Sequence, residues 1–144
     1  MNSVLSSDIT LVPITAEHKP LIDQIIDEIA RLKIENHGES FIEFSGDKEM
    51  QLFAHQDEIK GFCEIYFSGG IPYIDVYVLE KFRGQGLGPA VTIKLKEQLF
   101  NTGHSAVGIR THKRNKRAME SAEKSGFVMI DDGVELNLDN QEKP

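Results

Sequence analysis

The sequence lacks the features that define several large classes of protein. Cys63 is the only cysteine in 144 residues, so no disulfide can form within the chain. No apolar run approaches the roughly 18 residues that a membrane-spanning helix needs. Residues 1–12 are too polar, and too poor in basic side chains, for a secretory signal. Together these absences predict a cytoplasmic protein with no disulfide and no membrane association.

Metal-binding and nucleic-acid-binding patterns are also missing. The five histidines are scattered, with no second ligand at a spacing that would hold a metal ion. The formal net charge of −7 argues against a nucleic-acid-binding surface. An acidic chain is compatible with a cationic substrate such as an amine, although the need for solubility is sufficient to explain the charge.

Length and composition are those of an ordinary globular protein. The chain is 40% hydrophobic and 27% charged, and it contains no internal repeat and no low-complexity linker. A chain of 144 residues is long enough to bury a core and short enough for one domain. We therefore expect a single domain over residues 1–144, with a polar tail from about residue 139.

Hydrophobic periodicity predicts strands alternating with helices. Strands are predicted over 9–14, 50–55, 59–67, 71–79, 105–111, 127–130 and 134–138, and helices over 15–38, 89–100 and 115–125. This order predicts an α/β fold with a mixed, mostly antiparallel central sheet flanked by helices. The crossover through helix 89–100 should join two parallel strands.

The first helix and the hairpin strands show which faces are buried. Apolar residues recur at helical spacing at Leu21, Ile22, Ile25, Ile26, Ile29 and Leu32. The acidic residues Asp23, Asp27 and Glu28 lie off this stripe, so we expect them on a solvated face. Cys63 falls in an apolar pattern and is expected in the core, not as a nucleophile.

A glycine-rich segment separates the strand 71–79 from the helix that follows. It reads Arg-Gly-Gln-Gly-Leu-Gly over 83–88. Backbone N–H groups at a helix start have no intrahelical acceptor and attract anions, and glycines let a phosphate come close. The segment is not a nucleotide P-loop, because no Lys-Ser or Lys-Thr follows, and its GxGxG spacing differs from the dinucleotide-binding GxGxxG. A turn without a ligand is the plain alternative.

Two motifs together resemble those of one family. Arg83-x-x-Gly86-x-Gly88, after a strand that carries Val76 and Val78, resembles the acetyl-CoA pyrophosphate loop of the GNAT superfamily of N-acetyltransferases. Downstream, the segment NKRAMESAEKSGF is similar to the second motif of that superfamily, an N-x-x-A sequence, a helix and then Gly-Phe. In this chain these residues are Asn115, Ala118, Gly126 and Phe127. The resemblance covers roughly residues 50–131.

The resemblance implies a GNAT-like fold and an acetyl-CoA-dependent N-acetyltransferase that acts on a primary amine by direct attack in a ternary complex. It also implies that the backbone of the strand binds pantetheine and that the loop binds the pyrophosphate. A homodimer is compatible with it. The residues that would bind acetyl-CoA are Val76, Tyr77, Val78, Arg83, Gly84, Gln85, Gly86, Leu87, Gly88 and Asn115.

Two residues are candidates for the general base. Asp75 and Glu64 lie on the strands that would flank the thioester, and either can accept a proton directly or through water. Each also fits an ordinary polar partner in a sheet. Many GNAT enzymes have a tyrosine acid seven residues after the motif asparagine, where this chain has Ala122. That departure leaves open an acyl-CoA-binding or sensing module with little catalysis. The glycine loop alone leaves open an unrelated phosphate-binding protein.

Overall fold

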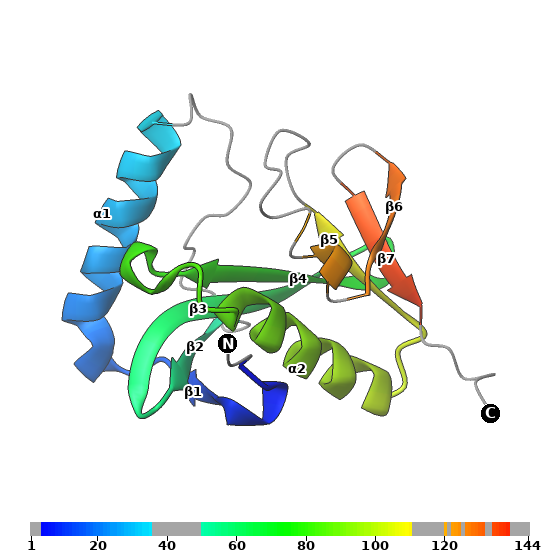
Figure 1. The fold of residues 1–144 in the computed structure, drawn as a ribbon, viewed down its shortest axis with the longest axis horizontal. Coiled ribbons are helices and arrows are strands. Elements are labelled where there is room, and N and C mark those ends of the chain that lie inside the picture. The colour runs from blue at the N-terminus through cyan, green and yellow to red at the C-terminus, as the bar shows by residue number, and fades with distance from the viewer. Residues whose placement is uncertain are drawn as a thin grey trace.

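The computed structural model describes residues 4–35, 50–110, 120, 122–124, 126–131 and 134–138. These residues form a seven-stranded sheet in the order β1-β2-β3-β4-β5-β7-β6, with a long helix on each face (Figure 1). The strands are β1 (Ile9–Pro13), β2 (Met50–His55), β3 (Glu58–Ser68), β4 (Ile71–Val78), β5 (Ala106–Arg110), β6 (Val128–Asp131) and β7 (Val134–Leu138). The long helices are α1 (Lys19–Glu35) and α2 (Leu87–Asn101), and 3-10 turns span Ser6–Asp8, Ala16–His18 and Glu80–Phe82.

The sheet is mixed and mostly antiparallel. Every neighbouring pair of strands is antiparallel except β4 and β5, which are parallel and joined by α2. The predicted fold class and the parallel crossover are therefore confirmed. The residue Asn115 and the polar tail from about residue 139 lie outside the described residues, so the predictions on them stay predictions.

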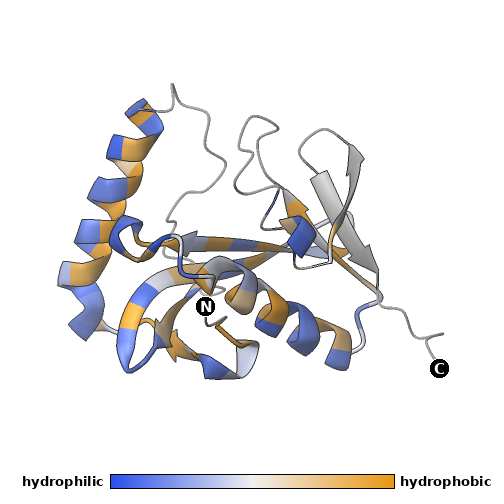
Figure 2. Ribbon diagram, viewed as in Figure 1, coloured by the Kyte–Doolittle hydropathy of each residue, from blue (hydrophilic) through white to orange (hydrophobic). Residues whose placement is uncertain are grey.

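Helix α1 covers one face of the sheet, and its apolar side is the predicted one except at Ile26. Ile25 and Ile29 are buried against Phe62 and Tyr77 of the sheet. Ile26 is 44% exposed, so its place in the buried stripe was wrong. Figure 2 shows the apolar and polar bands alternating along this helix.

The prediction for the acidic residues of α1 is correct for two of the three. Asp23 and Asp27 are exposed, whereas Glu28 is half-buried. Glu28 follows Ile25 by three positions and precedes Leu32 by four, so it lies over the same side of the helix as these two residues. Its position at the border of the stripe explains why it reaches the sheet.

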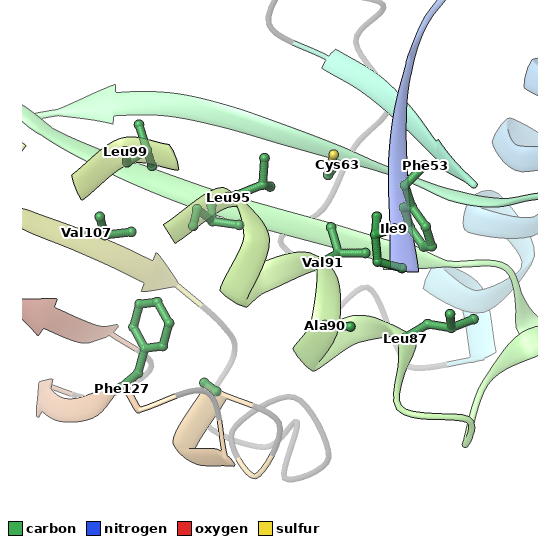
Figure 3. Close-up of a cluster of buried hydrophobic side chains, with 12 residues drawn as sticks. Ile9, Phe53, Cys63, Leu87, Ala90, Val91, Leu95, Leu99, Val107 and Phe127 are labelled. Carbon is green, nitrogen blue, oxygen red and sulfur yellow. The ribbon is translucent and has the colours of Figure 1, made fainter. Parts of the chain in front are cut away.

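Helix α2 packs on the opposite face. Its apolar residues contact β1, β4 and β5, and Figure 3 shows several of them beside Cys63, Val107 and Phe127. The helix ends in a Schellman motif, because Gly103 has a φ of 101° and the His104 N–H donates to the Leu99 carbonyl over 3.1 Å. The predicted end of this helix near residue 100 is confirmed.

The Gly-Phe pair of the second motif forms a helix end like that of α2. Gly126 has a φ of 91°, and the Phe127 N–H donates to the Ala122 carbonyl over 3.1 Å. Ala122 and Phe127 are 2% and 3% exposed and belong to the core beneath α2. The glycine therefore ends one helical turn, and the phenylalanine anchors the chain before β6 begins.

Gly61 on β3 lets an aromatic ring lie flat on the sheet. It is the register partner of Phe53 on β2 and of Val78 on β4. A Cβ atom at Gly61 would lie 2.0 Å from the Tyr77 carbonyl oxygen and 2.6 Å from the Phe53 ring. No side chain fits there without moving the backbone of the central strand.

The substitution Gly61→Ala is expected to lower the free energy of unfolding by about 1–3 kcal/mol, because it overpacks a close contact. Urea unfolding followed by far-UV circular dichroism measures the change. Glu58→Ala, at the exposed start of the same strand, is the control and should change stability by less than about 0.5 kcal/mol. Equal midpoints for the two variants would contradict the packing argument.

Candidate active site

Strand β4 is fully paired with β3 on one side and has, among the described residues, one paired position on the other. It pairs with β3 along its whole length, from Ile71 to Val78. With β5, among the described residues, it pairs at one position, Tyr73 with Gly108. A Cβ at Gly108 would lie 2.5 Å from the Tyr73 ring, so a glycine is needed where the strands meet. The described part of β5 ends at Arg110, two residues beyond this pairing, so no described β5 residue lies level with Val76 to Val78. We call this stretch of β4, on its β5 side, the opening.

The hydrogen-bond register identifies which backbone groups of β4 face this opening. The Leu79 N–H donates to the Lys60 carbonyl of β3 over 2.9 Å. Because backbone groups alternate sides along a strand, those of Tyr77 and Asp75 also point to β3, and those of Val76 and Val78 point toward the open side. Of the three β4 residues predicted to bind the cofactor, Val76 and Val78 therefore direct their backbone into the opening.

The glycine loop lies at the end of β4 beside this opening. Gly84 and Gly86 have φ values of 81° and 84°, in the left-handed region that favours glycine, and Gly86 is the N-cap of α2. Within the described part of the chain, the N–H groups of residues 84–88 donate to no backbone carbonyl. The loop thus presents unpaired donors together with the positive end of the α2 dipole.

Arg83 braces the start of the loop. Its Nε donates to the Val78 carbonyl over 2.9 Å, and its Cζ lies 5.1 Å from the centre of the Tyr77 ring. Neither contact uses a carboxylate, and no salt bridge among the described residues includes Arg83. The guanidinium charge therefore stays close to the loop without a described acidic partner.

Tyr77 joins the loop region to α1. Its hydroxyl donates to the Glu28 carboxylate, and the Glu80 N–H donates to the same carboxylate oxygen over 2.9 Å. Burial, and then the hydrogen bond to Glu28, raises the pKa of the Tyr77 phenol well above its ordinary value. Sequence patterns predicted a backbone role for Tyr77 and missed Glu28, because nothing in the spacing links a helix acid to a phenol on a distant strand.

The two candidate bases lie opposite each other on the α1 face of the sheet. Glu64 on β3 and Asp75 on β4 are register partners, and both are half-buried. The pairs on either side are aromatic. Phe62 stacks on Tyr77 and Tyr66 stacks on Tyr73, each with ring centres 5.5 Å apart. Two carboxylates thus lie between two stacked pairs of rings.

The remaining predicted residues divide into two groups. Asn115 lies outside the described residues. Ala122, the position of the usual tyrosine acid, is buried. Among the described residues no group of three metal-binding side chains occurs, and no helix there has the length and apolar character needed to cross a membrane.

Comparison with known proteins agrees with this geometry. The family model described as "Acetyltransferase (GNAT) family" matches residues 19–127. The chain belongs to this acetyltransferase family. A sequence search of curated proteins finds no match.

Solved structures of acetyltransferases share the fold at low sequence identity. A ribosomal L7/L12 alpha-N-protein acetyltransferase in its apo form is 15% identical, with a TM-score of 0.71 over 94% of this chain and 92% of the other. The spermidine N-acetyltransferase from Vibrio cholerae, in complex with CoA and spermine, is 13% identical, with a TM-score of 0.65 over 94% and 98%. An aminoglycoside acetyltransferase in complex with coenzyme A and kanamycin is 18% identical, with a TM-score of 0.65 over 90% and 94%.

Cys63 lies in the core as predicted, and its burial predicts that the thiol reacts slowly with labelling reagents. Its side chain is 2% exposed, and burial raises the pKa of the thiol to about 12. Since the thiolate is the reactive form, labelling of the folded protein near pH 8 should be at least about 100-fold slower than in concentrated urea. Stopped labelling with a chromogenic thiol reagent measures both rates, with free cysteine as the reference. Labelling of the folded protein at the rate of free cysteine would contradict the burial of the Cys63 thiol.

Proposed function

We propose that this protein transfers an acetyl group from acetyl-CoA to a primary amine by direct attack within a ternary complex. The observation that carries the proposal is the stretch of β4 beyond its one described pairing with β5, directly beside an N–H-rich glycine loop. A strand edge and an anion-binding helix start, side by side, suit a ligand with amide groups at one end and phosphates at the other.

Acetyl-CoA has these two parts. The N–H groups of residues 84–88 are proposed to bind the pyrophosphate, and the backbone of Val76 and the N–H of Val78 to pair with the pantetheine amides. The Val78 carbonyl already accepts from Arg83, so Arg83 braces the strand end while its charge lies close to the phosphates. Tyr77 supports the site through its ring, which lies beside the Arg83 guanidinium, and through its hydroxyl, which donates to Glu28. Asn115 stays a predicted cofactor contact.

The reaction needs a neutral amine and a stabilised oxyanion. The amine nitrogen attacks the thioester carbonyl carbon and forms a C–N bond, the C–S bond then breaks, and the electron pair leaves with the sulfur. Asp75 or Glu64 accepts the proton that the amine loses, directly or through water. A β4 N–H on the open side donates to the carbonyl oxygen as charge develops there. Ala122 cannot donate a proton, so water protonates the thiolate.

An amine acceptor fits the α1 face. Glu64 and Asp75 place two carboxylates side by side on this face, and carboxylates attract a cationic amine. The stacked rings on both sides add faces that attract cations. The related fold of the Vibrio cholerae enzyme is named for spermidine and was solved with spermine, which agrees with an amine substrate without specifying one for this chain.

One alternative has a specific observation in its favour. A buried alanine at position 122 removes the usual acid, as expected for an acyl-CoA-binding or sensing module with little catalysis. Tight acetyl-CoA binding without turnover on any amine would favour it. The cytoplasmic location and a homodimeric state stay predictions.

The first test is the release of free CoA thiol from acetyl-CoA across a panel of polyamines, aminoglycosides, peptide amines and small amines, beside a calorimetric acetyl-CoA titration. The transferase proposal expects binding and at least one productive amine. Binding with a silent panel supports the sensing module, and no binding to any CoA ester refutes both.

Gly84→Asp should weaken acetyl-CoA binding by roughly 100-fold, because a charge about 5 Å from a phosphate costs on the order of 3 kcal/mol at an effective dielectric near 20. Gly70→Asp is a matched control. Gly70 and Gly84 have φ values of 80° and 81°, and a Cβ at either position meets no atom within 4 Å. The backbone strain and added charge are therefore equal, and only the location differs. Equal affinities in the two variants would refute the loop assignment.

Asp75→Asn and Glu64→Gln separate the two candidate bases. Loss of the base should lower kcat by about 100-fold or more and abolish the rise of kcat with pH, while the acetyl-CoA dissociation constant changes little. The other variant should keep a pH-dependent rate. Steady-state rates on the best amine, measured across pH, decide between them. Unchanged profiles in both variants would mean that neither carboxylate takes the proton.

A further inference from the structure

One carboxylate oxygen of α1 holds two groups at the end of β4. Glu28 Oε2 accepts from the Tyr77 hydroxyl and from the Glu80 N–H, the latter over 2.9 Å. Glu28 precedes these partners by 49 and 52 positions in the chain. The contact therefore ties α1 to the strand end across the face of the sheet, and it uses one side-chain and one backbone donor.

The Tyr77 side chain and the Glu80 backbone each contact Arg83, the first residue of the glycine loop. The Tyr77 ring, stacked on Phe62, lies 5.1 Å from the Arg83 guanidinium carbon. Glu80 begins the 3-10 turn Glu80–Phe82, and the Arg83 N–H donates to the Glu80 carbonyl over 3.3 Å. Arg83 in turn donates to the Val78 carbonyl. The side chain and the backbone of Arg83 are thus both fixed by groups that Glu28 holds.

Arg31 adds a weaker contact one turn further along α1. Its guanidinium pairs with the side chains of Glu80 and Glu35. The Arg31 and Glu80 side chains are each 47% exposed, and exposed ion pairs contribute little. Glu28, which is half-buried and bonded to a buried phenol, is the stronger of the two attachments.

We propose that Glu28 is a positioning residue that sets the conformation of the glycine loop and, through it, the affinity of the site for acetyl-CoA. This inference rests on the proposed function for its ligand. Glu28 acts through Tyr77, Glu80 and Arg83, and not on the cofactor itself. A loop that is held ready binds more tightly, because the apparent affinity scales with the fraction of molecules in the competent conformation.

Three variants separate this role from general stabilisation. Glu28→Ala removes the acceptor of both hydrogen bonds. Glu28→Gln keeps an oxygen at the same position, so it can retain both bonds while losing the charge. Asp23→Ala is the matched control, because it removes a carboxylate from the same helix whose ion-pair partner is the exposed Lys19.

The experiment combines amide hydrogen exchange on the ligand-free protein with calorimetric titration of acetyl-CoA. In Glu28→Ala, exchange at the Glu80 amide and across residues 84–88 should be about tenfold faster, and acetyl-CoA binding about tenfold weaker. Glu28→Gln and Asp23→Ala should stay within about twofold of the unsubstituted protein on both measurements. Exchange in α2 beyond its first turn should be unchanged in all three variants.

The outcomes are distinct. Equal exchange and equal affinity in Glu28→Ala and Asp23→Ala would overturn the inference, and so would a Glu28→Gln variant as impaired as Glu28→Ala. If Glu28→Ala does not fold, Tyr77→Phe takes its place, and values like those of the unsubstituted protein would overturn the inference. Absence of acetyl-CoA binding in the unsubstituted protein would refute the proposed function, while the exchange comparison still decides whether Glu28 fixes the loop.

Discussion

The structure depends on a central strand that is fully paired on one side and, among the described residues, paired at one position on the other. Backbone N–H and C=O groups inside a protein need partners, and β4 obtains a complete set from β3. On its other side β5 supplies one described register position, where Gly108 lies against Tyr73. The glycine loop, the start of α2 and the Arg83 guanidinium all lie at the end of β4 that extends beyond the described part of β5. The side of β4 with one described pairing therefore sets the place of the candidate site.

The two faces of the sheet contribute different chemistry to this place. Helix α2 and the loop supply backbone donors and a helix dipole from one face. The opposite face, under α1, carries Glu64 and Asp75 between stacked aromatic rings. An opening in the sheet is the one location where groups on the two faces can act on the same atoms. This arrangement suits two substrates that approach from opposite sides.

Strong local signals explain what the sequence predicted well. Period-two alternation and turn residues located the β2–β3–β4 strands, and glycines located the loop and the helix ends, because each of these features depends on neighbouring residues. The register is a non-local property, so the sequence could not tell which residues turn their backbone groups toward the opening. Those of Val76 and Val78 point there, whereas those of Tyr77 point to β3. Glu28 was expected in solvent and Ile26 in the core, because helical spacing does not fix where the edge of a buried stripe falls.

The junction between β4 and β5 also has a thermodynamic consequence. In the described part of the sheet, the N-terminal meander and the β5-β7-β6 group share one register pair, and α2 packs on both. A ligand bound in the opening would contact both parts and add backbone partners between them. Ligand that binds only the folded state adds about 2.7 kcal/mol of stability at a concentration 100 times its dissociation constant. The melting temperature of the protein would then vary with the supply of its own co-substrate, which couples its persistence to the metabolic state of its surroundings.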